Sequence, residues 1–188
     1  MTDPTLQTFL ETGAYLRGHF RLTSGLHSAE YLQSAKILQY PNIAEKLGKQ
    51  LAEAMPKGES VASPALGGLI IGHEVARAMG TRFIFTERDA EGKMQLRRGF
   101  TVQPGEKFVV VEDVVTTGGS TKEVIELLQA LGAEVLGAGS IIDRSGGTAD
   151  VGVPRVALTT LKPETWPEDF CPLCKQGLPV EKPGSRKA

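Results

Sequence analysis

The sequence is poor in cysteine, balanced in charge and free of long apolar runs. Only two cysteines occur in 188 residues, which excludes the disulfide framework of a small secreted protein. No apolar run reaches the roughly 18 residues of a membrane-spanning helix, and the N-terminus lacks a basic region followed by an apolar stretch. The net charge of −1 argues against a general nucleic-acid-binding surface. We therefore expect a soluble, cytoplasmic protein with no membrane or nucleic-acid partner, in which any anion site is local.

The two cysteines stand together in the stretch CPLC, as Cys171 and Cys174. A structural zinc site needs four ligands, and the nearest histidine along the chain, His73, is far away. A thioredoxin-like redox motif would open a helix after a strand, whereas this pair lies in a proline-rich segment. We expect a local loop staple or two free thiols; a metal shared between subunits and a redox function are alternatives.

Apolar residues alternate between helical and strand periodicity along most of the chain. The pattern predicts helices over 3–13, 41–55 and 120–132, and another that ends at Gly80. Strands are predicted near residue 60 and over 81–87, 107–113, 133–144 and 155–161. Strands separated by helices pair in parallel through crossover connections. The sequence therefore predicts an α/β fold with a central parallel sheet flanked by helices, in one domain.

The most informative stretch is VVVEDVVTTGGST, residues 109–121. After Val111 we expect the chain to leave the strand through Glu112 and Asp113, and the helix within residues 120–132 to begin near Lys122. Between them, glycines, hydroxyls and free helix-start amides form a cradle for an anion. The cradle consists of Thr116, Thr117, Gly118, Gly119, Ser120 and Thr121. Carboxylates repel phosphate, so a simple phosphate site would not have Glu112 and Asp113 beside it. The pattern indicates a sugar phosphate, whose phosphate lies in the cradle and whose diol donates hydrogen bonds to the acids. The alternative is an ordinary strand-to-helix turn.

This stretch resembles the signature loop of the type I phosphoribosyltransferases, which bind 5-phosphoribosyl 1-diphosphate (PRPP). A second stretch, SPALGGLIIG at residues 63–72, resembles the diphosphate loop of that family, in which the amides of Gly67 and Gly68 approach the diphosphate. The resemblance implies the type I phosphoribosyltransferase fold with a small N-terminal hood. We expect a hood at residues 1–40, an α/β core at 41–162 and an irregular C-terminal tail at 163–188.

Two further stretches resemble the orotate phosphoribosyltransferases within that family. FRLTSGLHSAEYL, residues 20–32, is similar to their hood element, and IIDRSGG, residues 141–147, to the strand and arginine that face orotate. Orotate is a planar anion, which Arg144 can hold by charge-assisted hydrogen bonds, with Thr116, Ser24 and Gly25 completing the base site. The resemblance implies phosphoribosyl transfer to orotate in pyrimidine synthesis. The alternatives are a purine or other-base phosphoribosyltransferase and a non-catalytic regulator that senses PRPP.

Several cations of the usual family pattern are missing or displaced. Thr23 and Gly67 stand where many members have lysine, and the loop TERDAEGKMQLRRGF, residues 86–100, has no histidine. We expect Arg88 and Lys93 to close over the diphosphate as catalytic cations, with Asp113 orienting the ribose. Mg²⁺ would bridge diphosphate and ribose hydroxyls without direct ligation by the protein.

The resemblance also implies a symmetric homodimer in which the loop of one subunit covers the site of the other. We expect the cations of this loop, which include Arg97 and Arg98, to lack acidic partners and to await a polyanion.

Overall fold

The computed structural model describes residues 3–22 and 24–183, so Thr23 lies outside the described residues. The chain forms two compact units. Met1–Ile37 and Lys162–Ala188 make up the first, which we call the terminal unit, and Leu38–Leu161 the second, which we call the sheet unit. Among the described residues, no helix has the length and apolar character needed to cross a membrane.

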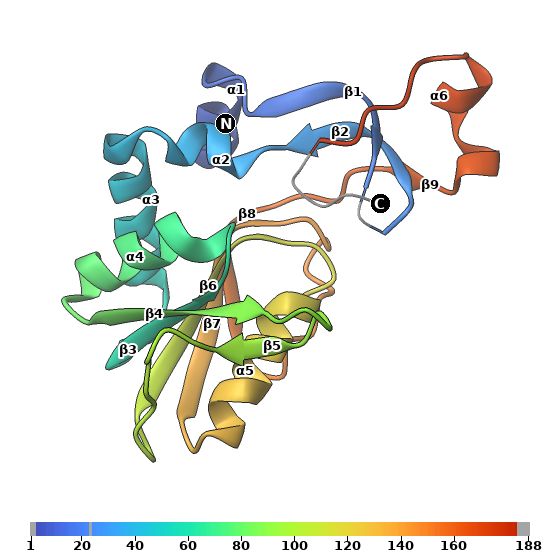
Figure 1. Ribbon diagram of the computed structural model, residues 1–188. Coiled ribbons are helices and arrows are strands. Elements are labelled where there is room, and N and C mark those ends of the chain that lie inside the picture. The colour runs from blue at the N-terminus through green and yellow to red at the C-terminus, as the bar shows by residue number, and fades with distance from the viewer. Residues whose placement is uncertain (1–2, 23, 184–188) are drawn as a thin grey trace. The chain divides into compact units, whose positions relative to one another are not determined.

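The sheet unit alternates strands with helices, as the periodicity predicted (Figure 1). Its strands lie in the order β5-β4-β3-β6-β7-β8, and all neighbouring pairs are parallel except β4 with β5. The expected α/β fold with a largely parallel central sheet is thereby confirmed. The elements of the unit are α3 (Pro41–Ala54), β3 (Ser60–Pro64), α4 (Gly68–Met79), β4 (Arg82–Arg88), β5 (Met94–Leu96), β6 (Lys107–Val115), α5 (Gly119–Ala130), β7 (Glu134–Asp143) and β8 (Arg155–Thr160).

Helices cover both faces of this sheet. On β7, Ala138 belongs to the apolar cluster under α5, whereas a side chain at the next position, Gly139, would collide with Met55 at the end of α3. Successive strand residues point to opposite faces, so α3 and α5 lie on opposite sides of the sheet. Helix α4 packs on α3 and against β3 and β6, which places it on the α3 side.

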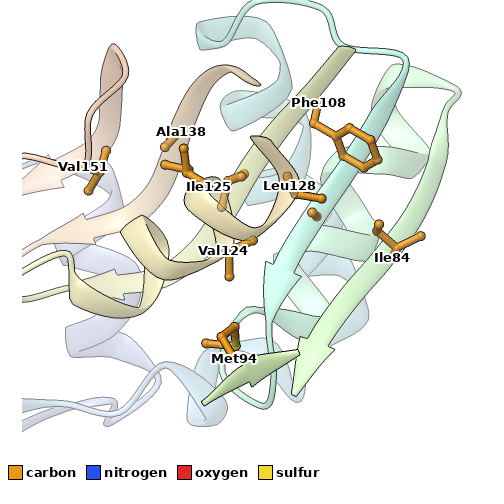
Figure 2. Packing of buried hydrophobic residues seen from close by; sticks show 10 residues of the cluster. Ile84, Met94, Phe108, Val124, Ile125, Leu128, Ala138 and Val151 are labelled. Carbon is orange, nitrogen blue, oxygen red and sulfur yellow. The ribbon is translucent and has the colours of Figure 1, made fainter. Parts of the chain in front are cut away.

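The cluster under α5 explains why the amphipathic stretch after the cradle folds as a helix there. Val124, Ile125 and Leu128 point from α5 toward the sheet, where they meet Phe108 and Ile84 (Figure 2). All five side chains are at most 2% exposed. Burial of such side chains stabilises the fold by about 1.5–3 kcal/mol each, which fixes the helix start relative to the strand ends.

The terminal unit is smaller and contains short elements. Helix α1 begins after Asp3, whose carboxylate accepts hydrogen bonds from the amides of Thr5 and Leu6. Strands β1 and β2 form an antiparallel hairpin, and β9 pairs with β2. The elements are α1 (Pro4–Glu11), β1 (Tyr15–Arg21), β2 (His27–Leu32), α2 (Ser34–Leu38), β9 (Thr165–Trp166), the 3-10 helix η1 (Glu168–Phe170) and α6 (Pro172–Lys175).

The segment after residue 162, which we expected to be an irregular tail, therefore carries β9, η1 and α6 and belongs to the same unit as the N-terminal residues. The backbone of Glu181 also pairs with β1, because its amide donates to the carbonyl of His19 and its carbonyl accepts from the amide of Arg21, both at 2.8 Å.

Candidate functional site

Strand β6 is longer than the sequence indicated. The prediction that the chain leaves the strand through Glu112 and Asp113 was wrong, because pairing with β7 continues through Glu112, opposite Ser140, to Val115, opposite Asp143. Glu112 is 8% exposed and Asp113 is half-buried. The two acids are thus held by the sheet itself, where their backbone cannot shift without breaking the β6–β7 ladder.

The expected anion cradle forms at the start of α5. The helix begins at Gly119, three residues before the predicted Lys122, and its first backbone bond runs from the Lys122 amide to the Gly118 carbonyl at 2.8 Å. Gly118 has φ 82°, and a Cβ there would lie 2.8 Å from Val151. Only glycine fits this position. The amides of the first helical turn have no carbonyl partner within the helix, so they are available to an anion.

The hydroxyls of the cradle differ in accessibility. Thr116 and Thr117 are exposed on the turn, and Ser120 is half-buried in the first turn of α5. Thr121 is 2% exposed, so its side chain packs inside the unit. The accessible hydroxyls of the cradle are therefore those of Thr116, Thr117 and Ser120, with Gly119 contributing an exposed backbone position.

A second glycine-containing loop meets β6 beside the acids. It connects β3 to α4 and contains a cis peptide bond between Ala65 and Leu66. A Cβ on Gly67 would lie 2.6 Å from Oδ1 of Asp113, and one on Gly68 would lie 3.0 Å from the carbonyl oxygen of Val111. The loop backbone thus approaches the acidic segment more closely than any other residue type would allow.

Arg88, at the end of β4, reaches the cradle of its own chain. Its guanidinium donates to Oγ of Ser120 at 3.3 Å and to the carbonyl of Gly92 at 2.6 Å, and it pairs with Glu123 at 2.6 Å. The structure therefore brings one predicted cation to the predicted anion site.

The arginines around the turn after Arg88 have acidic partners that we did not expect. Asp89 accepts a hydrogen bond from the amide of Lys93 at 2.8 Å, closing a turn between β4 and β5. The expectation that the loop cations lack acidic partners was wrong: Arg98 pairs with Glu87 at 2.7 Å, as Arg88 does with Glu123. These acids were missed because β4–β5 pairing and the fold of α5, rather than proximity in sequence, bring them to the arginines.

Lys93 and Arg97 are both exposed beyond this turn. Within the residues that the structure describes, Lys93 makes no ion pair, so its ammonium group remains available to a ligand.

Arg144 lies at the same sheet edge as the cradle. Its amide donates to the carbonyl of Val115 at 2.8 Å, so it follows β7 directly beside the point where Thr116 follows β6. The fold thus brings together Thr116 and Arg144, the two residues of the sheet unit that were predicted to bind orotate.

Asp143 organises the loop that carries Arg144, a role that the sequence did not reveal. Its buried carboxylate accepts from the amide and hydroxyl of Ser145 at 2.7 and 2.6 Å and from the amide of Gly147 at 2.9 Å. It also pairs with Arg155 at 2.9 Å. Burial by itself raises a carboxyl pKa, but the hydrogen bonds from Ser145 and the Arg155 ion pair outweigh it, so the pKa of Asp143 is lowered. The signal available was an Asp followed by Ser and Gly at a strand end.

Ser24 and Gly25 belong to the terminal unit. They form the exposed turn of the β1–β2 hairpin, where Gly25 has φ 84° and its amide donates to the carbonyl of Leu22 at 2.9 Å.

The cysteines of the CPLC stretch lie next to two histidines. Side-chain ligand atoms of His19, His27, Cys171 and Cys174 all lie within 4.8 Å of one another, and both cysteines are free thiols. His73 is the nearest histidine to the cysteines along the chain, but the histidines that lie next to them in space are His19 on β1 and His27 on β2.

Comparison with known proteins agrees with this arrangement. The family model described as "Phosphoribosyl transferase domain" matches residues 33–173. Orotate phosphoribosyltransferase of Desulforamulus reducens is 53% identical over 187 residues, which cover 98% of this chain and 97% of that protein. The corresponding protein of Thermotoga maritima is 53% identical over 178 residues, covering 94% and 95%. The crystal structure of orotate phosphoribosyltransferase from Aeropyrum pernix superimposes with a TM-score of 0.71 at 29% identity, over 83% of this chain and 93% of that one.

The chain therefore belongs to the phosphoribosyltransferase family and, within it, to the orotate phosphoribosyltransferases. The resemblance inferred from the signature loop and from the stretches around Ser24 and Arg144 is confirmed.

Replacement of Asp143 by Asn should destabilise the protein. The substitution leaves the nearly buried Arg155 without its counter-charge, which costs about 3–5 kcal/mol in the free energy of unfolding at pH 7. Because the pKa of Asp143 is lowered in the folded state, its contribution is present above the unfolded pKa and is lost as pH falls through the folded pKa. Denaturant unfolding should thus show a difference from wild type that shrinks below about pH 4.

Asp150→Asn is the matched control. Asp150 is exposed, and within the described part of the chain its carboxylate accepts only from the amide of Gly152 at 2.9 Å, which an Asn side chain can also do. We expect a change within about 0.5 kcal/mol. Equal effects of the two substitutions would show that Asp143 does not hold its loop.

Proposed function

We propose that this chain transfers the phosphoribosyl group from PRPP to orotate, giving orotidine 5′-monophosphate and diphosphate, in de novo pyrimidine synthesis. The observation that carries the proposal is the sheet edge itself. An anion cradle, a half-buried carboxylate and Arg144 lie at the ends of neighbouring strands, in a chain about half identical to proteins named for this activity.

The cradle suits the 5-phosphate of the substrate. Amides of the first turn of α5 point outward, the helix dipole favours a negative charge there, and Thr116, Thr117 and Ser120 supply accessible hydroxyls. We propose that Asp113, whose carboxylate lies beside the Gly67 backbone, accepts hydrogen bonds from the ribose hydroxyls. The same carboxylate favours the positive charge that develops on the sugar as the diphosphate leaves.

On the diphosphate side of the site, backbone amides and fewer cations than the usual family pattern has would bind the ligand. Gly67 and Gly68 allow the loop amides to approach the ligand, and Arg88 lies against Ser120 at the cradle. Its pairing with Glu123 means that PRPP must compete for this guanidinium. We propose that the exposed Lys93 supplies a further charge when the β4–β5 turn moves over the diphosphate.

We propose Mg²⁺ as the cofactor, held mainly by substrate oxygens. Asp113 offers the oxygen donors that magnesium prefers, and across residues 3–22 and 24–183 the only group of three or more metal-ligating side chains is the His19 cluster. A magnesium ion bound with PRPP would neutralise charge on the leaving diphosphate. A site completed by the substrate agrees with this sparse donor set.

We also propose a cytoplasmic homodimer with shared active sites. Arg88 contacts the cradle of its own chain, so a loop cation that the partner subunit supplies to this site must be a residue other than Arg88. Lys93 is the candidate, because it is exposed at the end of the turn, directly before β5, and makes no ion pair among the described residues. A twofold dimer would build two such shared sites.

A turnover assay tests the proposed reaction. Protein, Mg²⁺ and PRPP are mixed with orotate, adenine, hypoxanthine or uracil in separate reactions; orotate consumption is followed by absorbance, and diphosphate release is measured with every base. We expect turnover with orotate alone, at about 1–10³ s⁻¹. Turnover only with another base would identify an other-base enzyme, and PRPP binding without turnover would identify a regulator; either result contradicts the proposal.

Arg144→Ala should weaken orotate binding specifically. Loss of charge-assisted hydrogen bonds to the base costs about 1.5–3 kcal/mol, so the KM for orotate should rise about 10–100-fold while that for PRPP changes little. Initial-rate kinetics with each substrate varied in turn measure both constants. Arg77→Ala, which removes an exposed arginine on α4 that pairs with Glu74 and Glu45, is the control and should alter neither. An equal rise of both KM values would place Arg144 outside the base site.

Mixing of two inactive variants tests the shared site. Asp113→Asn and Lys93→Ala should each lower activity by about tenfold or more. If Lys93 acts on the partner's substrate, mixed dimers hold one site with both lesions and one with neither. Random exchange should then restore about a quarter of wild-type activity, since about half of the dimers are mixed and each has one intact site. Recovery no greater than the residual activities, with exchange verified by mass, would mean that each chain uses its own Lys93.

A further inference from the structure

Four potential metal ligands converge in the terminal unit, outside the residues assigned to PRPP and orotate. His19 comes from β1 and His27 from β2; Cys171 directly precedes α6, and Cys174 lies within it. His19, His27 and Cys171 are at most 4% exposed, and Cys174 is half-buried. We propose that these four side chains bind a structural Zn²⁺ ion that ties the C-terminal segment to the β1–β2 hairpin.

The separations between ligand atoms fit tetrahedral zinc. Nε2 of His19 lies 3.5 Å from Sγ of Cys171 and 3.6 Å from Sγ of Cys174, and Nδ1 of His27 lies 3.3 Å from Sγ of Cys174. A tetrahedron with ordinary Zn–N and Zn–S bond lengths has N···S edges of about 3.5 Å and N···N edges of about 3.3 Å. The two ring nitrogens are 2.8 Å apart, so the imidazoles need to part by only about 0.5 Å to reach that edge.

The hydrogen bond behind His19 orients its ring for metal binding. Nδ1 of His19 lies 2.8 Å from the carbonyl oxygen of Leu178. A carbonyl oxygen can only accept, so Nδ1 carries the proton and Nε2 presents its lone pair to the other three side chains. An imidazole that donates its second N–H to a carbonyl is the usual support of a metal-bound histidine.

Backbone geometry also converges on this point. The β1–β2 register shifts between Arg17 and Phe20, a bulge that redirects the His19 side chain. The two cysteines have the C-x₂-C spacing of zinc sites and lie one helical turn apart, with the amide of Lys175 bonded to the carbonyl of Cys171 at 3.2 Å. Two thiolates and two neutral imidazoles around Zn²⁺ carry no net charge, which suits a buried position.

Apart from the pairing of β9 with β2 and of Glu181 with β1, the C-terminal segment has little apolar packing to hold it in place. Across described residues 162–183, Cys171 is the only buried residue. Large apolar side chains of this segment remain in water: Phe170 is 71% exposed, Leu178 44% and Val180 45%. A segment without a hydrophobic core of its own needs another kind of cross-link, and a metal ion supplies one.

Metal analysis of the untagged, full-length protein tests the proposal. Protein purified from zinc-supplemented cells and dialysed should contain about one zinc per chain, as expected for a closed four-ligand site. Replacement by Co²⁺ should give the visible absorption of a tetrahedral ion together with a thiolate-to-cobalt charge-transfer band. Less than about 0.1 zinc per chain, or a cobalt spectrum without the thiolate band, would overturn the site, as would a Cys171–Cys174 disulfide found under reducing purification.

Histidine variants identify the ligands. His27→Ala should weaken zinc binding by at least about a hundredfold, because loss of even an outer hydrogen-bond partner costs about 10–100-fold. His73→Ala is the matched control: it removes the third histidine of the chain, which packs edge-on against Phe83 on the sheet unit, and zinc content should stay unchanged. Equal zinc loss in both variants would contradict the assignment.

Limited proteolysis gives a readout independent of metal counting. Removal of zinc with a chelator should expose residues 162–183 to cleavage and leave the sheet unit intact, and re-addition of zinc should restore protection. If Cys171→Ser or Cys174→Ser does not fold, the wild-type cobalt spectrum and this chelation test still decide the question. Unchanged proteolysis on chelation would show that the segment is held without a metal.

Discussion

The pairing of β6 with its two neighbours is the constraint on which the candidate site depends. Phe108 through Val111 are completely buried, and the strand is bonded to β3 on one side and β7 on the other. Its carboxyl end therefore has one position relative to the loops that follow β3 and β7. The acids, the start of α5 and Arg144 all take their places from that end, so the site is held by a strand whose central residues are completely buried.

Small residues then decide how closely the surrounding segments approach. Gly67 places loop backbone against the Asp113 carboxylate, where a side chain would force that carboxylate to move. Glycine stands at this position where many members of the family have lysine, a departure noted in the sequence. A lysine here would have to displace Asp113 or redirect the loop. The chain instead places Arg88 at the cradle, with Glu123 holding its guanidinium in position.

Most of the sheet unit could be predicted from the sequence because its signals are local. Buried parallel strands are continuous apolar runs, and the helices between them show 3.6-residue periodicity closed by Gly80 and Gly132. The errors arose where tertiary structure overrides those signals. Glu112 interrupts the apolar run yet is buried in the β6–β7 ladder, and Gly118 starts α5 earlier than the hydroxyl-rich sequence suggested. The partners of Arg88 and Asp143 come from other elements, which no local pattern encodes.

The histidine and cysteine cluster was missed for the same reason, and its position suggests why a cross-link would matter there. His27 begins β2 two residues after Gly25, and His19 lies two residues before the end of β1. The cluster therefore joins the two strands that carry the Ser24–Gly25 turn. That turn is exposed and is closed by two backbone bonds, in which the amide of Gly25 donates to the carbonyl of Leu22 and the amide of Leu22 donates to the carbonyl of Leu26. Two-stranded hairpins are marginally stable alone, and β9 adds only two residues to this one. A metal ion at its base would fix the geometry of the turn without requiring a larger hydrophobic core in the terminal unit.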